Sequence, residues 1–88
     1  ADDLTVEHVW PAPGMPQLPV ATPDGVVCVT GGASGTLTIA RPLGGRYAEQ
    51  TINVGRAPHD PLLAADGAHV FVPCAGDGEI VKVRLTDG

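Results

Sequence analysis

Residues 51–85 read TINVGRAPHDPLLAADGAHVFVPCAGDGEIVKVRL, and this stretch defines the architecture more firmly than any other. Apolar segments at residues 61–64 and 69–72 and an alternating segment at residues 80–85 are each of a length typical of β-strands. Asp66-Gly67 separates the first two runs, and residues 75–78 separate the next two. Because Gly accepts the positive φ that tight hairpins demand, the stretch predicts three strands joined by tight turns.

The first half of the chain contains a second copy of this pattern. Asp24-Gly25 reappears 42 residues later as Asp66-Gly67, and Pro16 and Pro19 reappear as Pro58 and Pro61. One inserted residue later, residues 35–40 match residues 78–83. A period of roughly 40 to 45 residues is typical of a four-stranded propeller blade. Helical repeats of this length would need an apolar period near 3.6 residues, which is absent.

The stretch at residues 51–85 resembles the YVTN-type β-propeller repeat, in which a strand is followed by V-G-x-x-P, an apolar strand, a D-G turn and further strands. Val54-Gly55, Pro58 and Asp66-Gly67 carry the resemblance here. It implies an all-β fold with two consecutive blades. The first blade covers residues 12–54 and the second covers residues 55–88 without an outer strand, while residues 4–10 form the outer strand of an adjoining blade.

In the first blade we expect an innermost strand at residues 18–21, then strands at residues 26–30, 36–40 and 46–54. The run 26–30, VVCVT, is apolar at nearly every position, which indicates that both faces are covered. Residues 42–45, PLGG, predict a turn before the outer strand. Prolines at positions 11, 13, 16 and 19 exclude a helix before the first strand.

Two blades alone leave sheet faces in water, because repeat units are buried by their neighbours. We therefore expect partners of the same kind. Either the chain is part of a larger propeller, or identical chains close a ring, with six blades from a trimer or eight from a tetramer. In the second case residues 4–10 of a neighbouring chain would complete the second blade.

Charge excludes some partners. The net charge is −5, and the five basic residues are scattered, so we expect no nucleic-acid binding, which needs a basic face. No apolar run approaches the roughly 18 to 20 residues that cross a membrane. The chain begins Ala1-Asp2-Asp3, and the resembled propellers are often periplasmic or secreted, so we expect the same location here.

The two cysteines, Cys28 and Cys74, are too few and too far apart for a zinc signature. They are not matched by the internal copy, and we expect them on different sheets. The sequence therefore predicts two buried free thiols rather than a disulfide.

The loop at residues 55–60, GRAPHD, contains the candidate site. In a propeller this loop borders the mouth of the central channel. Arg56, His59 and Asp60 place a cation, an imidazole and a carboxylate there, whereas the counterpart at residues 14–18 has none of these groups. We expect these three residues to bind a ligand.

The roles of the three residues stay open at this point. His59 is either a ligand of a metal or heme-type iron, a general base oriented by Asp60, or a residue that caps the turn. Asp60 alternatively forms an Asx turn before Pro61, and Arg56 either pairs with an anionic ligand or is solvated. His8 and His69 share no spacing with His59, so the sequence predicts no metal site, and it identifies no catalytic residue.

The resemblance leaves several functions open. We expect a noncatalytic module that binds a protein or small ligand across the ring face. The alternative is part of a redox or cofactor-binding propeller, similar to the cytochrome d1 domain or the large subunit of amine dehydrogenase, that uses His59. A third class, lactonase-like hydrolases, needs acidic metal ligands around the channel that this sequence lacks. Neither enzymatic activity nor a cofactor is assigned.

Overall fold

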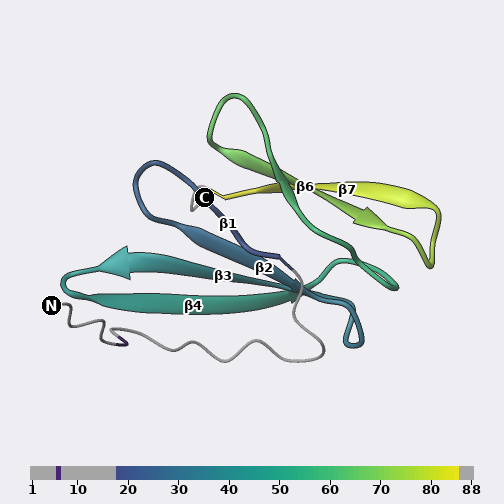
Figure 1. Ribbon diagram of the computed structural model, residues 1–88, viewed down its shortest axis with the longest axis horizontal. Helices are drawn as coiled ribbons and strands as arrows, with labels where there is room; N and C mark the ends of the chain where they lie inside the picture. The colour runs from purple at the N-terminus through teal and green to yellow at the C-terminus, as the bar shows by residue number, and fades with distance from the viewer. Residues whose placement is uncertain (1–5, 7–17, 86–88) are drawn as a thin grey trace, which may run out of the picture.

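Figure 1 shows the chain as a series of strands joined by turns, and glycines with positive φ lie in several of these turns. The structure, a computed structural model, describes Val6 and residues 18–85. The described chain forms two antiparallel sheets. Sheet one has the order β1 (Val20–Ala21), β2 (Val27–Gly31), β3 (Thr36–Leu43), β4 (Arg46–Asn53), and sheet two has the order β5 (Leu62–Leu63), β6 (His69–Cys74), β7 (Glu79–Arg84). The expected all-β class is therefore confirmed, and the expected strand at residues 4–10 lies outside the described residues apart from Val6.

Side-chain hydrogen bonds fix the first turn of each sheet. In sheet one the amide of Val26 donates to Thr22 Oγ1 at 3.0 Å, and the Thr22 hydroxyl donates to Asp24. In sheet two the amide of Ala68 donates to Asp66 Oδ1 at 2.9 Å. Both turns place a glycine at positive φ, +93° for Gly25 and +69° for Gly67, a conformation that is costly for other residues.

The turn expected at residues 42–45 begins later than predicted. β3 continues through Pro42 to Leu43, and only Gly44 and Gly45 turn the chain, with φ of +56° and +84°. Pro42 pairs with Tyr47 on β4, while the register between β2 and β3 ends at Val27 and Ala40. Pro42 thus extends past β2, where its missing N–H is not required by a neighbouring strand on that side.

The core lies between the two sheets. Successive side chains on a strand point to opposite faces, so the pairing registers identify which residues share a face. The inner face of sheet one contains Val20, Cys28, Thr30, Leu37, Ile39 and Ile52. The inner face of sheet two contains Leu63, Val70, Val72, Val81 and Val83. Leu37, Val70 and Val72 are completely buried in this contact.

Both cysteines lie in the core and neither forms a disulfide, as the sequence predicted. Burial raises the pKa of the Cys28 thiol to about 11, and the nearby positive charge of Arg41 offsets only part of that rise. Burial also raises the pKa of Cys74, and the negative charges of Asp77 and Glu79 add to it. Thiols with raised pKa values are poor nucleophiles, so these residues serve as small apolar side chains.

Candidate functional site

The rim loop, residues 55–60, connects sheet one to sheet two and lies along the end of β6. The amide of His59 donates to the carbonyl of Pro73 at 2.8 Å, and the amides of Ala75 and Gly76 donate to the carbonyls of Ala57 and Arg56 at 3.1 and 3.0 Å. The sequence GRAPHD thus continues the hydrogen bonding of sheet two rather than extending freely into solvent. This backbone pairing holds the loop that carries all three predicted site residues.

Arg56 is paired within the protein. Its Nε lies 2.8 Å from Asp77 Oδ1, its Nη2 donates to the carbonyl of Gly76 at 2.8 Å, and its amide donates to Asp77 Oδ2 at 2.9 Å. These hydrogen bonds hold the pKa of Asp77 below its usual value, the side-chain bond from Arg56 contributing most. Because 78% of the Arg56 side chain is still exposed, the guanidinium presents a fixed cation at the surface.

The other two predicted residues point to different partners. Asp60 Oδ1 accepts a hydrogen bond of 3.0 Å from the amide of Leu18, which leads into β1. The carbonyl of His59 accepts a 2.9 Å hydrogen bond from the buried hydroxyl of Thr30. No hydrogen bond joins the Asp60 carboxylate to the His59 ring, which is exposed. The loop therefore presents Arg56 and the His59 ring, and uses Asp60 to connect the two sheets.

A hollow of about 370 Å³ lies next to the rim loop. It is lined by Ala33, Ser34, Gly35, Asn53, Gly55, Arg56 and Ala57. Two features shape it. A Cβ on Gly35 would lie 2.5 Å from the Gly55 carbonyl oxygen, so only glycine permits this close approach. Ala57 has a φ of +51°, a left-handed conformation that costs roughly 1–2 kcal/mol for a non-glycine residue. The loop is thus held in one specific conformation beside the hollow.

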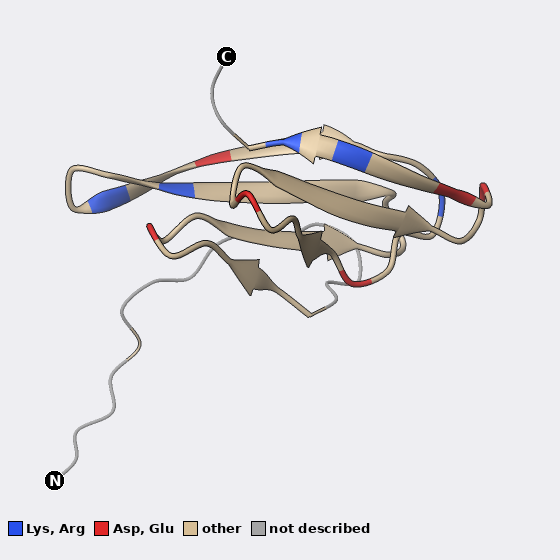
Figure 2. Cartoon of the chain, turned by 90° about the horizontal axis from the view of Figure 1, so that it is seen from above, with Lys and Arg blue, Asp and Glu red and all other residues tan. Residues whose placement is uncertain are grey.

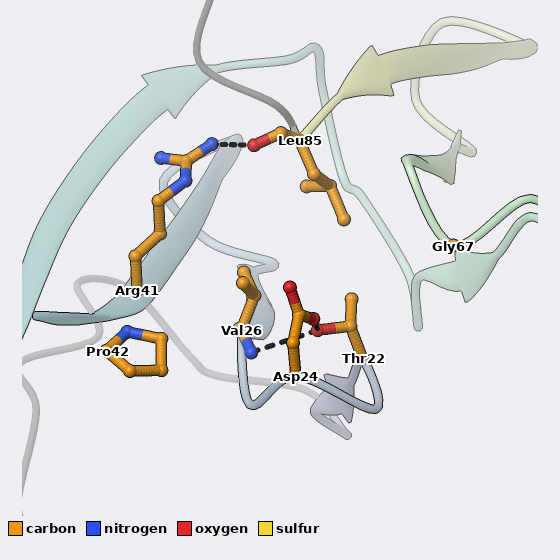
Figure 3. Close-up of a pocket in the computed structure, with 7 residues that line it drawn as sticks. All are labelled: Thr22, Asp24, Val26, Arg41, Pro42, Gly67 and Leu85. Atoms are coloured by element: carbon orange, nitrogen blue, oxygen red, sulfur yellow. Dashed lines mark hydrogen bonds between the residues drawn. The ribbon is translucent and has the colours of Figure 1, made fainter.

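A second hollow, of about 290 Å³, lies at the opposite end of the sheets and was not predicted from the sequence (Figure 3). Thr22, Asp24, Val26, Arg41, Pro42, Gly67 and Leu85 line it. Arg41 Nη2 donates to the carbonyl of Leu85, which links β3 to the end of sheet two. The sequence contained little indication of this hollow, because Asp24 was interpreted as a turn residue and Arg41 as one of several scattered cations.

Charged residues elsewhere form local pairs. His69 Nδ1 lies 2.9 Å from Asp66 Oδ2 within the second hairpin. The hydrogen bond from the Ala68 amide, and after it the contact with His69, hold the pKa of Asp66 below its usual value. Figure 2 shows basic and acidic residues distributed along both sheets. Among the described residues no group of three His, Cys, Asp or Glu side chains could hold a metal ion. No helix in this part of the chain has the length and apolar character of a membrane span.

Comparisons of the chain with protein-family models, curated proteins and solved structures found no match.

Proposed function

We propose that the chain is a noncatalytic interaction module built from blade-like repeats of a β-propeller, with its ligand or partner site at the rim loop. The neighbouring blades come from further repeats or from identical chains. The proposal combines a sequence copied within the chain with the manner in which the two sheets pack.

The observation that carries the proposal is which face of each sheet takes part in the contact between them. Val20 pairs with Cys28 in sheet one, and Leu62, 42 residues after Val20, pairs with Phe71 in sheet two. Cys28 likewise pairs with Ile39, and Phe71 with Lys82, each position 43 residues later. Cys28 and Ile39 lie on the inner face of sheet one, whereas Phe71 and Lys82 lie on the outer face of sheet two.

The two sheets therefore contact each other through non-equivalent faces. Had equivalent faces met, the pair would be a closed two-fold sandwich. Contact between one face and the opposite face of the next copy is instead the arrangement by which repeat units continue into an array. The β1 and β5 segments also come close to each other, joined by the hydrogen bond from Leu18 to Asp60, which are themselves 42 residues apart. These observations support consecutive blades around a common axis.

The rim loop is the part of this scaffold that is suited to bind a ligand. Its backbone is held by bonds to Pro73, Ala75 and Gly76, so little ordering entropy is lost on binding. Arg56 provides an oriented guanidinium and His59 an exposed imidazole, which together favour carboxylate or phosphate groups. A binding role is favoured over general-base catalysis because the Asp60 carboxylate is bonded to Leu18 and does not orient the His59 ring.

The test is a set of amide ¹H–¹⁵N spectra of the labelled protein, recorded while carboxylate- and phosphate-bearing fragments are added. We expect shifts that cluster at Arg56, Ala57, His59 and Gly76, and that decrease in Arg56→Gln. Arg84→Gln, which removes an exposed cation on β7, is the matched control and should not change them. Shifts confined to Asp24, Arg41 and Gly67 would reject the rim loop in favour of the second hollow. A visible absorption band that disappears in His59→Ala would replace the binding function with the cofactor-binding alternative.

A further inference from the structure

Sheet two has an apolar face, on the side away from sheet one, that residues 18–85 leave largely exposed. The registers place Leu62, Phe71 and Lys82 side by side on this face, and Pro73 beside Ile80. Leu62 and Ile80 are 65% and 72% exposed. We call this surface the open face, and it consists of Leu62, Phe71, Pro73, Ile80, Lys82 and Arg84. Large apolar side chains that are this exposed on one sheet face indicate a surface that binds a partner.

The first copy of the pattern shows how a face of this kind is covered. The positions matching the open face, 42 or 43 residues earlier, are Val20, Cys28, Thr30, Leu37, Ile39 and Arg41. All six lie on the inner face of sheet one. Sheet two covers the first five with Leu63 and the valines of β6 and β7, and Arg41, at the edge of this contact, donates to the carbonyl of Leu85. The occupant of the matching surface is thus a sheet that presents β-branched residues at positions 70 and 72 of its second strand.

The outer face of sheet one has the features that this occupant needs. Val27 and Val29 match Val70 and Val72, and both are half-buried. Thr38 and Ala40 on β3 also lie on this face and are buried, so the exposed part of the face is on β4, and the half-buried valines of β2 contribute the rest of the contact. Glu49 on β4 pairs with Ala40 and therefore lies on this same outer face, where it is exposed.

Charge supports the same pairing. Lys82 and Arg84 are exposed on the open face, and the Lys82 ammonium lies 5.7 Å from the centre of the Phe71 ring. The exposed Glu49 on the outer face of sheet one provides an opposite charge. Two open faces placed against each other would instead bring the cations of both copies together, which disfavours a symmetric dimer.

We propose that the open face binds the outer face of sheet one in a second copy of this chain, so that copies associate head to tail. This inference rests on the proposed blade-like repeats, and it names their partner. The contact repeats between chains the contact that the two sheets make within one chain. Because it joins two different surfaces, it continues from copy to copy until the rotation closes a ring.

Sedimentation velocity of the full chain over a range of concentrations tests the association. We expect mass that increases with concentration, and an apparent dissociation constant that rises about tenfold or more in Ile80→Arg, as for a central apolar contact. Leu43→Arg alters an equally large side chain, 53% exposed at the end of β3 outside the open face, and should leave association unchanged. Glu49→Lys should weaken association, and Glu49→Lys with Lys82→Glu should restore it.

A photo-crosslinking residue at position 80, in a mixture of ¹⁴N and ¹⁵N chains, identifies the partner surface. We expect crosslinks between chains to the peptide that contains Val27 and Val29. Crosslinks from position 80 to β7 of the other chain would establish a symmetric dimer and overturn the proposal, as would a monomer at every concentration. A monomer that still shows fragment-induced shifts at Arg56 and His59 would overturn this inference alone and leave the proposed rim-loop site standing.

Discussion

β3 and β7 occupy the same place in their sheets, and their surroundings differ. β3 lies between β2 and β4, whereas β7 has only β6 as a strand neighbour among the described residues. Leu37 on β3 is fully buried, and Ile80, 43 residues later on β7, is 72% exposed. Both positions are large and apolar, so the difference comes from the neighbours and not from the local sequence. The comparison indicates that Ile80 lacks, among residues 18–85, the covering sheet that buries Leu37.

The largest expected effect separates these two leucine-sized positions. Leu37→Ala should lower the free energy of unfolding by about 2–5 kcal/mol, because it leaves a cavity in the contact between the sheets. Ile80→Ala should change it by less than about 1 kcal/mol, since most of that side chain is in water. Urea unfolding followed by circular dichroism, at a concentration where the chain is monomeric, measures both. Equal losses would mean that β7 is as well covered as β3.

The next effect compares two glycines that both have positive φ. Gly35→Ala should cost about 3 kcal/mol, because the new Cβ would lie 2.5 Å from the Gly55 carbonyl oxygen and the φ of +72° is also strained. Gly44 has a φ of +56°, but a Cβ at this position would have no atom within 4 Å, so Gly44→Ala should lower the free energy of unfolding by only about 1 kcal/mol. Thermal unfolding of the two variants provides the comparison. A smaller loss at Gly35 than at Gly44 would show that the rim loop is not packed closely against the turn.

Local sequence patterns predicted the strands well and their packing poorly. Asp24-Gly25 and Asp66-Gly67 predicted the hairpins because turn chemistry depends on neighbouring residues. The run VVCVT predicted a strand covered on both sides, but not which face meets sheet two, because apolar residues occupy both faces. Pro42 was misread as part of a turn, since its tolerance in β3 depends on where β2 ends.

In the candidate site, too, residues close together in the sequence were predicted and their distant partners were not. Arg56, His59 and Asp60 were singled out because they lie together in one loop, and the structure describes all three there. The partners Asp77 and Leu18 were not predicted, because each lies far away in the sequence and is brought near only by the pairing of β6 and by the packing of the two sheets. The hollow beside Arg41 is lined by residues of sheet one and of sheet two, so no short stretch of the sequence could predict it.

A smaller effect concerns the hydroxyl that connects sheet one to the rim loop. Thr30 is fully buried and donates to the His59 carbonyl, whereas the matching position in sheet two is Pro73, which has no hydroxyl. Thr30→Val should lower the free energy of unfolding by about 1 kcal/mol, because the hydrogen bond from the Thr30 hydroxyl to the His59 carbonyl is lost. Gln50→Val, at an exposed position of β4, should cost less than about 0.5 kcal/mol. Denaturant unfolding distinguishes them, and an unchanged His59 amide shift in Thr30→Val would contradict the link to the loop.

The smallest effect is acid dependence at the rim. The pKa of Asp77 is lowered by its bonds to Arg56, so the carboxylate stabilises the folded state above its unfolded pKa of 3.8, and this contribution disappears as the pH falls through the lower folded value. The turn in sheet one has Ser34 at the matching position, so no such titration is expected there. A pH titration of the Asp77 carboxyl ¹³C resonance should show a midpoint below 3.8, and this midpoint should move upward in Arg56→Gln. A midpoint at or above 3.8 would contradict the pairing.

Methyl NOE spectra of the monomeric protein test most directly whether the two sheets meet through non-equivalent faces. The account predicts cross-peaks from the methyl groups of Leu37 and Ile39 to those of Val70 and Val72, and none from the same methyl groups to Leu62 or Ile80. Cross-peaks from Leu37 and Ile39 to Leu62 and Ile80 within one chain would mean that equivalent faces meet. That result would contradict both the repeat array and the open face.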